Sequence, residues 1–147
     1  METTKATAIT KNIFWFGVLL TGIIFFSSCA KKINFLNSAV APAARGDVKI
    51  KKDGNNNYNI KIQLLDLAES NRLQPPKNTY VVWLESDNSY VKNIGQIKSD
   101  INFLAKKLKA SFETVSTVKP TRIFITAEDD GSVQYPGTVV VLTTGSL

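Results

Sequence analysis

The sequence predicts an all-β domain, an antiparallel β-sandwich of about seven strands, preceded by a signal or anchor helix and a flexible tether. Apolar and polar residues alternate over short segments, which is the period of a half-buried strand. Clusters of Gly, Pro, Asn and Asp separate these segments, and the region from residue 47 onward has no long helical period. Many short strands with frequent turns are typical of a sandwich.

The expected domain spans residues 47–147, because the alternation of apolar and polar residues begins at residue 47. A phase slip at Leu64–Leu65 indicates a β-bulge or a strand end, and Gly95 indicates a kink. Residues 99–104 are ambiguous and fit a single helical turn, and residues 113–120 are expected to be a connection. The seven expected strands are residues 48–51, 58–67, 79–85, 90–98, 107–112, 121–127 and 138–143.

The segment Thr79–Glu85 is apolar on both faces, which predicts a strand buried on both sides. Trp83 within it is expected to be a core residue rather than a platform for a ligand. Residues 29–46 have no clean period and an Ala/Pro-rich part, so we expect them to form the flexible tether.

The first 28 residues have the layout of a secretory signal peptide. Two lysines precede an apolar run of 14 residues, 13–26. The run ends in two small residues and the only cysteine of the chain, Ser27, Ser28 and Cys29. These positions resemble the cleavage box of bacterial lipoprotein signals, although Leu is commoner than Phe26 at the first position. The resemblance implies that residues 1–28 are a lipoprotein signal peptide, with cleavage before Cys29 and a lipid on its sulfur.

Two alternatives to lipidation are an uncleaved transmembrane helix and free secretion. A membrane span needs about 20 apolar residues, and a run of 10–14 fits a signal peptide better. Lys31 and Lys32 would also lie on the outer side, against the positive-inside tendency. A single free thiol is unusual in an exported protein, and lipidation would give it a use.

The second half of the chain contains six pieces typical of one family. They are Tyr80-Val81-Val82-Trp83-Leu84, Asn93-Ile94-Gly95-Gln96, Phe124-Ile125-Thr126-Ala127-Glu128, Asp130-Gly131-Ser132, Tyr135-Pro136-Gly137 and Val139-Val140-Val141-Leu142. Together they resemble the extracytoplasmic domain of bacterial anti-sigma-K factors. The resemblance implies an immunoglobulin-like β-sandwich outside the cytoplasm. Only 12 residues precede the apolar run, too few for the sigma-binding domain of that family, so we expect no direct binding of a sigma factor.

The composition argues against most catalytic chemistry. The chain has no histidine, which excludes Ser-His-Asp and Cys-His arrangements, and one cysteine cannot build a zinc or iron–sulfur site. No cofactor is expected. The acidic trio Glu128, Asp129 and Asp130 is expected to be a solvated turn. A calcium site, completed by an aspartate of another loop, is the alternative, with three candidates, Asp53, Asp66 and Asp87.

The chain carries 18 Lys and Arg against 12 Asp and Glu, a net charge of +6. Most lysines are scattered, which indicates a solvated face. Contact with anionic lipid headgroups or another acidic surface polymer is the alternative. A nucleic-acid partner is not expected, because the chain has an export signal and no recognised binding motif.

The expected function is that of a non-enzymatic lipoprotein, anchored to the bilayer through acylated Cys29, whose sandwich binds or supports an envelope protein. Ala30 is not the aspartate that often retains bacterial lipoproteins at the inner membrane, so the outer membrane, facing the periplasm, is the expected location. A sensory module related to anti-sigma factors is the alternative function.

Overall fold

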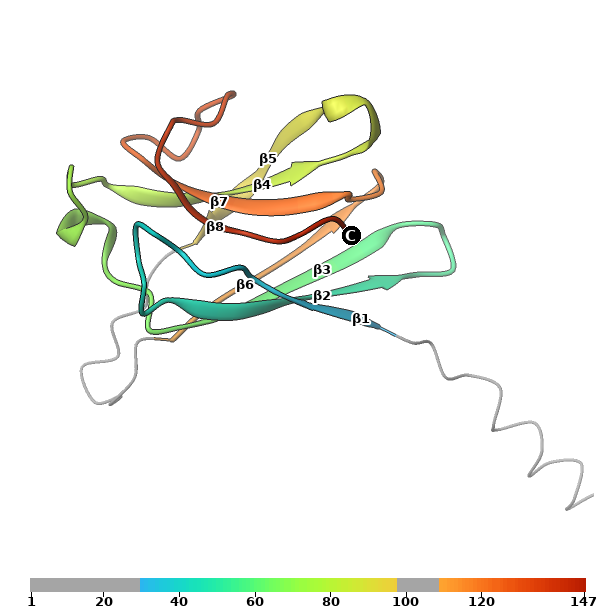
Figure 1. The fold of residues 1–147 in the computed structure, drawn as a ribbon. Coiled ribbons are helices and arrows are strands. Elements are labelled where there is room, and N and C mark those ends of the chain that lie inside the picture. The colour runs from blue at the N-terminus through green and yellow to red at the C-terminus, as the bar shows by residue number, and fades with distance from the viewer. Residues whose placement is uncertain (1–29, 98–108) are drawn as a thin grey trace, which may run out of the picture.

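The computed structural model describes residues 30–97 and 109–147, which form a two-layer β-sandwich (Figure 1). One antiparallel sheet has the order β1 (Lys31–Asn34), β2 (Arg45–Lys52), β3 (Tyr58–Leu65) and β6 (Lys109–Ser116). The other has the order β5 (Val91–Ile97), β4 (Thr79–Glu85), β7 (Arg122–Glu128) and β8 (Val140–Thr143). Two short 3-10 turns, η2 (Ser70–Arg72) and η3 (Asp87–Ser89), flank β4. The all-β prediction is confirmed.

Some connections join neighbouring strands of one sheet, and others cross from one sheet to the other. The pairs β2–β3 and β4–β5 are antiparallel neighbours in sequence, as are β7 and β8. The chain changes sheet between β3 and β4, between β5 and β6, and between β6 and β7. Such crossings are the Greek-key connections of an immunoglobulin-like sandwich.

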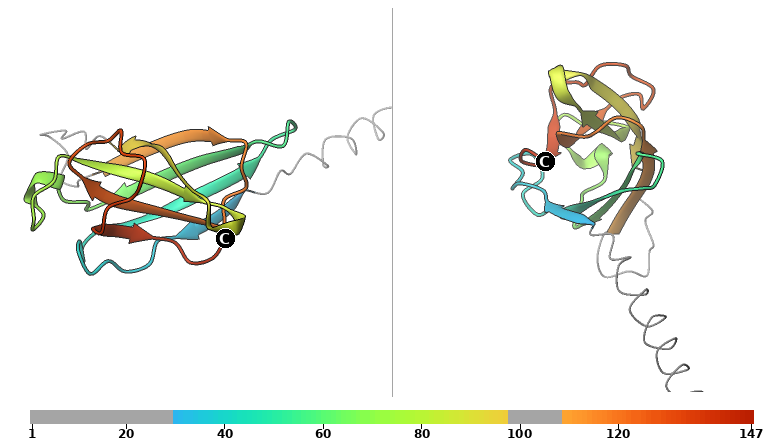
Figure 2. Two further views of the ribbon diagram at one scale, coloured as in Figure 1. Left: turned by 90° about the horizontal axis from the view of Figure 1, so that it is seen from above. Right: turned by 90° about the vertical axis from the view of Figure 1, so that its right-hand side faces the viewer.

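The core lies between the two sheets, which Figure 1 shows edge-on and the right panel of Figure 2 shows end-on. Alternate residues of β3 and β4 face it, because successive side chains of a strand point to opposite sides. Its largest fully buried aliphatic members are Ile60, Ile62, Leu64, Leu84, Ile123, Ile125 and Leu142. Each such side chain contributes about 1.5–3 kcal/mol through its removal from water.

The structure differs from the predicted tether. Residues 31–34 form the edge strand β1, which pairs with β2 from Lys31 opposite Ile50 to Asn34 opposite Asp47. In the connection to β2, Ala41 and Ala44 are buried in the core. The expected domain boundary at residue 47 is therefore wrong, and the described residues form eight strands of the sandwich. Four residues with two lysines carry too little alternation to be recognised without the neighbouring strand.

Strand β6 extends to Ser116, so the expected connection at 113–120 begins four residues too early. Val115 lies on its outer face and is 60% exposed. An apolar residue on this face breaks the alternation by which the sequence indicates a strand. The slip at Leu64–Leu65 is a strand end, since β3 stops at Leu65 and Asp66 has a positive φ of 57°. The ambiguous turn at 99–104 lies outside the described residues.

The predicted kink in β5 is present at Gly95, which has a φ of 138°. The ladder between β4 and β5 shifts register there, between Val82 and Trp83. Asn93 holds the bend, because its Oδ1 accepts a hydrogen bond from the backbone N–H of Gly95 at 3.0 Å.

Candidate functional site

The sandwich has two chemically different ends. We name the end where β1 begins the entry end; it also carries the β2–β3 turn at 53–57, the β4–β5 connection at 86–90 and the β6–β7 connection at 117–121. The opposite end, which we name the far end, carries the connections 35–44, 66–78 and 129–139. The right panel of Figure 2 looks onto the entry end.

Cys29, the predicted lipidation site, lies outside the described residues, as does the predicted signal peptide 1–28. The fold nevertheless limits where its neighbours lie, since β1 begins at Lys31. Two Cα–Cα steps span about 7 Å at most. Whatever is attached to Cys29 is therefore held close to the entry end.

A cavity of about 310 Å³ lies at the entry end. Ile50, Tyr58, Pro120 and Leu147 form its apolar walls, and its charged lining consists of Lys31, Lys52 and Lys119. The Nζ atom of Lys52 lies 5.9 Å from the centre of the Tyr58 ring, which is the range of a cation–π contact. The cavity thus gathers three cations from separate parts of the chain.

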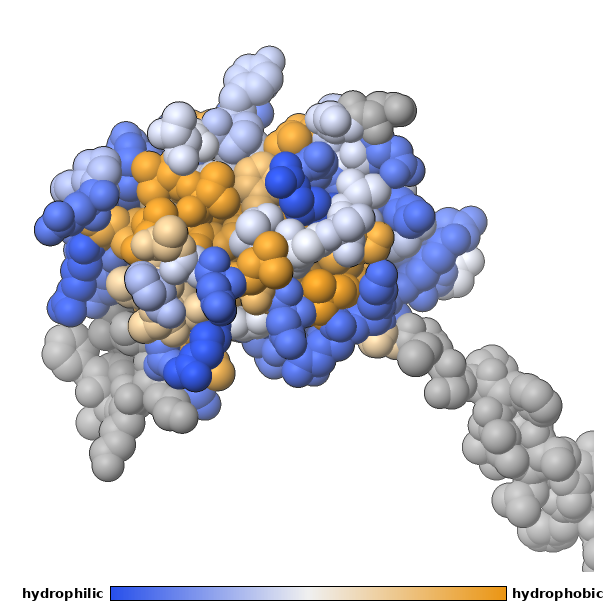
Figure 3. Space-filling view, in the orientation of Figure 1, coloured by the Kyte–Doolittle hydropathy of each residue, from blue (hydrophilic) through white to orange (hydrophobic). Residues whose placement is uncertain are grey.

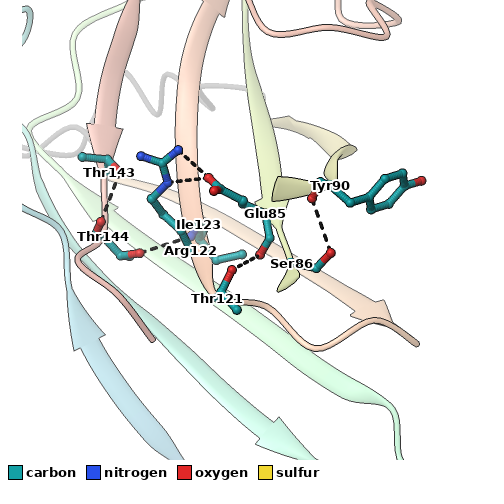
Figure 4. Close-up of polar contacts among 8 residues, drawn as sticks. All are labelled: Glu85, Ser86, Tyr90, Thr121, Arg122, Ile123, Thr143 and Thr144. Atoms are coloured by element: carbon teal, nitrogen blue, oxygen red, sulfur yellow. Dashed lines mark hydrogen bonds and ion pairs between the residues drawn. The ribbon is translucent and has the colours of Figure 1, made fainter. Parts of the chain in front are cut away.

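The other polar groups of the entry end are engaged with one another (Figure 4). Arg122 of β7 donates from its Nε to Oε2 of Glu85 at 2.6 Å, and its terminal nitrogen binds the same oxygen. The hydroxyl of Thr121 donates to the backbone carbonyl of Glu85 at 3.1 Å. Thr144 accepts from the backbone N–H of Ile123 at 3.1 Å. These contacts join the ends of β4 and β7 to each other and to the C-terminal segment at the entry end.

The far end presents apolar side chains beside charged ones such as Asp66 and Arg72. A shallow cavity of about 590 Å³ lies there between residues 39–43 of the β1–β2 connection and residues 66–74, and alanine, valine, proline and leucine side chains form much of its lining. Leu36 is 55% exposed, Val40 37% and Leu65 39%. Figure 3 shows a large group of hydrophobic residues toward the left of the visible face, on the side opposite the start of β1.

A second cluster of buried residues lies on the outer face of the β5-β4-β7-β8 sheet. Trp83 is fully buried there and stacks on Phe124, with ring centres 6.2 Å apart. Val133 of the connection at 129–139 packs over this cluster, as does Val91 of β5. The prediction that Trp83 is a core residue is confirmed, but this core lies outside the space between the sheets.

A buried chain of hydrogen bonds joins this cluster to the covering connection. Nε1 of Trp83 donates to Oγ1 of Thr126 at 2.7 Å, and Thr126 donates to Oε1 of Glu128 at 2.5 Å. The same carboxylate oxygen accepts the backbone N–H of Gly137 at 2.7 Å. A side chain on Gly137 would meet the carboxylate, because an added Cβ would lie 2.7 Å from Oε2 of Glu128.

Asn93 holds the covering connection at its other end. Its Nδ2 donates to the backbone carbonyls of Gly131 at 3.0 Å and Val133 at 2.9 Å. Gly131 itself packs directly against the side chain of Gln96. The pieces that resemble the anti-sigma-K family therefore include residues that meet in one structural unit, the outer face of this sheet and its cover.

The three acidic residues at 128–130 have separate roles. Glu128 is buried in the hydrogen-bond chain, so the expectation of a solvated turn is wrong for this residue. Asp129 pairs with Nζ of Lys77 at 2.7 Å, and Oδ1 of Asp130 accepts the backbone N–H of Ser132 at 2.9 Å. This contact and the Ser132 hydroxyl lower the pKa of the Asp130 carboxyl.

The calcium alternative finds no assembled site in the part of the chain that the structure describes. Across residues 30–97 and 109–147, no three Asp, Glu, His or Cys side chains are grouped as ligands. Asp66 pairs with Arg45 at the far end at 3.0 Å. Asp53, in the β2–β3 turn, and Asp87, in η3, belong to the entry end.

Comparisons with protein-family models, curated proteins and solved structures found no match for this chain. In the described residues, no helix is long and apolar enough to cross a bilayer. The likeness to anti-sigma-K factors and to lipoprotein signals stays a prediction from sequence.

The cavity at the entry end was missed by sequence reasoning. Lys31 and Lys52 belong to the short lysine groups at 31–32 and 49–52, and Lys119 has no lysine beside it. No local signal links them, since the pairing of β1 with β2 and the position of residues 117–121 bring them together.

Proposed function

We propose that this chain is a non-enzymatic lipoprotein that is anchored by a lipid on Cys29 and presents its β-sandwich to an envelope protein. The observation that carries the proposal is the start of β1 at Lys31, two residues after Cys29. The predicted leader therefore ends where the folded domain begins. With so short a link, an anchor at Cys29 would keep the entry end against the membrane and direct the far end away from it.

The far end is the surface that we propose for the protein partner. Its exposed apolar side chains include Leu36, Val40 and Leu65, and Val40 lines the shallow cavity described above. Removing apolar surface from water is favourable, and the cores of protein interfaces are enriched in apolar side chains. We place the anchored protein at the outer membrane, facing the periplasm, on the basis of Ala30.

The intact mass of the membrane-extracted protein tests the anchor, with a Cys29→Ser variant as its control. We expect the mass of residues 29–147 plus a lipid adduct, and we expect the variant to lack the adduct. A mass that includes residues 1–28 without any adduct would overturn the proposal. Residues 13–29 would then be assigned to a transmembrane segment.

Site-specific cross-linking tests the partner surface. A photoreactive residue at Val40 is expected to capture an envelope protein, whereas the same residue at Val115, exposed on the outer face of β6, is the control. Equal capture of one protein from both positions would argue against a binding surface at the far end.

We propose a sensory module as the second candidate function. The unit formed by Trp83, Glu128 and the covering connection supports it, because it contains the pieces that resemble the anti-sigma-K family. In that case the protein should co-purify with a transmembrane regulator, and replacement of Trp83 should change the output of that regulator.

A further inference from the structure

We infer that the entry end is a docking surface for anionic phospholipid headgroups, with Lys31, Lys52 and Lys119 placed around a cavity for a headgroup phosphate. The inference rests on the proposed anchor at Cys29 and adds to it an orientation and a lipid preference. A lipid anchor alone would tolerate any bilayer composition, whereas this surface would distinguish anionic from neutral membranes.

The charge of the cavity is the first argument. Its lining includes three lysines and no aspartate or glutamate, and the described residues give none of the three lysines an ion-pair partner. Even with the carboxylate of Leu147 counted as an anion, positive charge is in excess. Clustered ammonium groups repel one another, and a phosphate between them would remove that repulsion.

Two acidic side chains of this end, Asp53 and Glu85, bind groups other than the three lysines. Both carboxylate oxygens of Asp53 are turned into its own loop, where Oδ1 accepts the N–H groups of Asn55 at 2.8 Å and Asn57 at 2.9 Å. Glu85 is paired with Arg122. These carboxylates are therefore held away from the three lysines, which leaves the cavity basic.

The outer face of the adjoining sheet extends the positive surface. Lys49 of β2 lies directly opposite Lys32 of β1 on one side and Lys61 of β3 on the other. Like charges placed directly across a ladder are destabilising. Ion pairs reduce the repulsion at both neighbours, since Lys32 pairs with Asp47 at 3.4 Å and Lys61 pairs with Glu113 at 3.2 Å. The charge of Lys49 lies between them. An anionic surface would relieve this row as well.

The position of the chain entry selects a membrane rather than a soluble anion as the occupant. Charges act strongly within a Debye length, about 10 Å at 0.1 M salt. The link of about 7 Å from Cys29 to the start of β1 is shorter than that. An anchored protein would therefore keep Lys31 within reach of the headgroups at all times, and a lysine near an anionic leaflet adds about 1 kcal/mol of attraction, or about fivefold in binding.

Lysine footprinting of the full-length, membrane-extracted protein tests this inference. The protein is reconstituted into vesicles of phosphatidylcholine alone or mixed with phosphatidylglycerol, and an amine reagent modifies accessible lysines. We expect Lys31, Lys52 and Lys119 to react several-fold more slowly in the anionic vesicles, and molar salt to remove the difference. Lys77, which pairs with Asp129, and Lys109, which lies opposite Leu65, are both at the far end of the sandwich and serve as internal references.

A charge-matched pair of variants completes the test. The fluorescence of a dye attached at position 115, through a Val115→Cys replacement, reports the difference between anionic and neutral vesicles. The triple variant Lys31→Gln, Lys52→Gln, Lys119→Gln is expected to lose this difference. The control Arg72→Gln, Lys77→Gln, Lys109→Gln removes the same charge from the far end and is expected to keep it. Equal protection in both lipids, or equal loss in both variants, would overturn the inference.

Two further results separate this inference from neighbouring explanations. Protection of the three lysines by inorganic phosphate without vesicles would assign the cavity to a free anion and overturn the membrane assignment. The adduct on Cys29 is measured separately by intact mass. Acylated protein with unprotected lysines would contradict the docking surface alone, whereas protein without an adduct would contradict the proposed function.

Discussion

The indole Nε1 of Trp83 donates a hydrogen bond of 2.7 Å to Oγ1 of Thr126, on the outer face of a sheet whose other face builds the main core. This contact joins β4 to β7 and starts the buried chain that ends at Gly137. A sheet face that would otherwise meet water is thereby covered by a connection. Four predictions about stability test this and other features of the fold.

Replacing Thr126 by valine keeps the shape of the side chain and removes its hydroxyl. The indole N–H and the Glu128 carboxylate would each lose a partner in a buried place, so we expect the free energy of unfolding to fall by about 1–3 kcal/mol. Denaturant unfolding measures it. In a Trp83→Phe background the same change should lower the free energy of unfolding by less, because the indole N–H that would lose its partner is absent. Identical costs in both backgrounds would show that the two residues are not coupled.

Replacing Gly95 by alanine tests the kink in β5. The φ of 138° disfavours any side chain, and an added Cβ would lie 2.7 Å from the Phe112 ring. We expect a loss of about 1–3 kcal/mol in thermal or chemical unfolding. Gly54→Ala is the matched control, since nothing lies within 4 Å of its added Cβ, and it should be neutral or stabilising by up to about 1 kcal/mol. A Gly95 variant as stable as the Gly54 variant would contradict the kink.

Tyr80 is expected to make the free energy of unfolding depend on pH in the alkaline range. Burial raises the pKa of its hydroxyl to about 12 from 10.0, and the hydroxyl donates to the carbonyl of Ala68 at 2.8 Å. Because the folded state holds this proton more tightly, its contribution is fully present below pH 10 and is lost as pH rises through 12. Unfolding free energies measured across that range should fall, and less steeply for Tyr80→Phe. The same slope in both proteins would exclude Tyr80 as the cause.

Hydrogen exchange tests whether β1 belongs to the domain. The antiparallel pairing of Lys31–Asn34 with β2 predicts backbone amides that exchange more slowly than those of a free chain. Ile33→Ser should speed exchange in this strand and lower stability by about 1 kcal/mol, because a half-buried apolar contact is lost. Exchange of residues 31–34 at the rate of an unstructured peptide would restore the tether that the sequence predicts.

Most strands were predictable because their chemistry is local. Strand β3 alternates cleanly, with Ile60, Ile62 and Leu64 facing the core, and alternation is all that its place in the sheet requires. Strand β1 was not predictable, because its pairing depends on β2, whose segment lies more than ten residues later. The prediction of where β6 ends was wrong for a related reason, since Val115 is apolar but lies on a face that is exposed to water.

By itself, the sequence determined the all-β class, the positions of seven strands and the kink at Gly95, since period and turn residues act over a few neighbours. Only the tertiary structure decided that Trp83 is covered from outside the sandwich and that Glu128 is buried beside it. It also decided that Lys31, Lys52 and Lys119 line one cavity. These relations join residues tens of positions apart, and strand pairing and sheet packing, rather than local preference, bring them together.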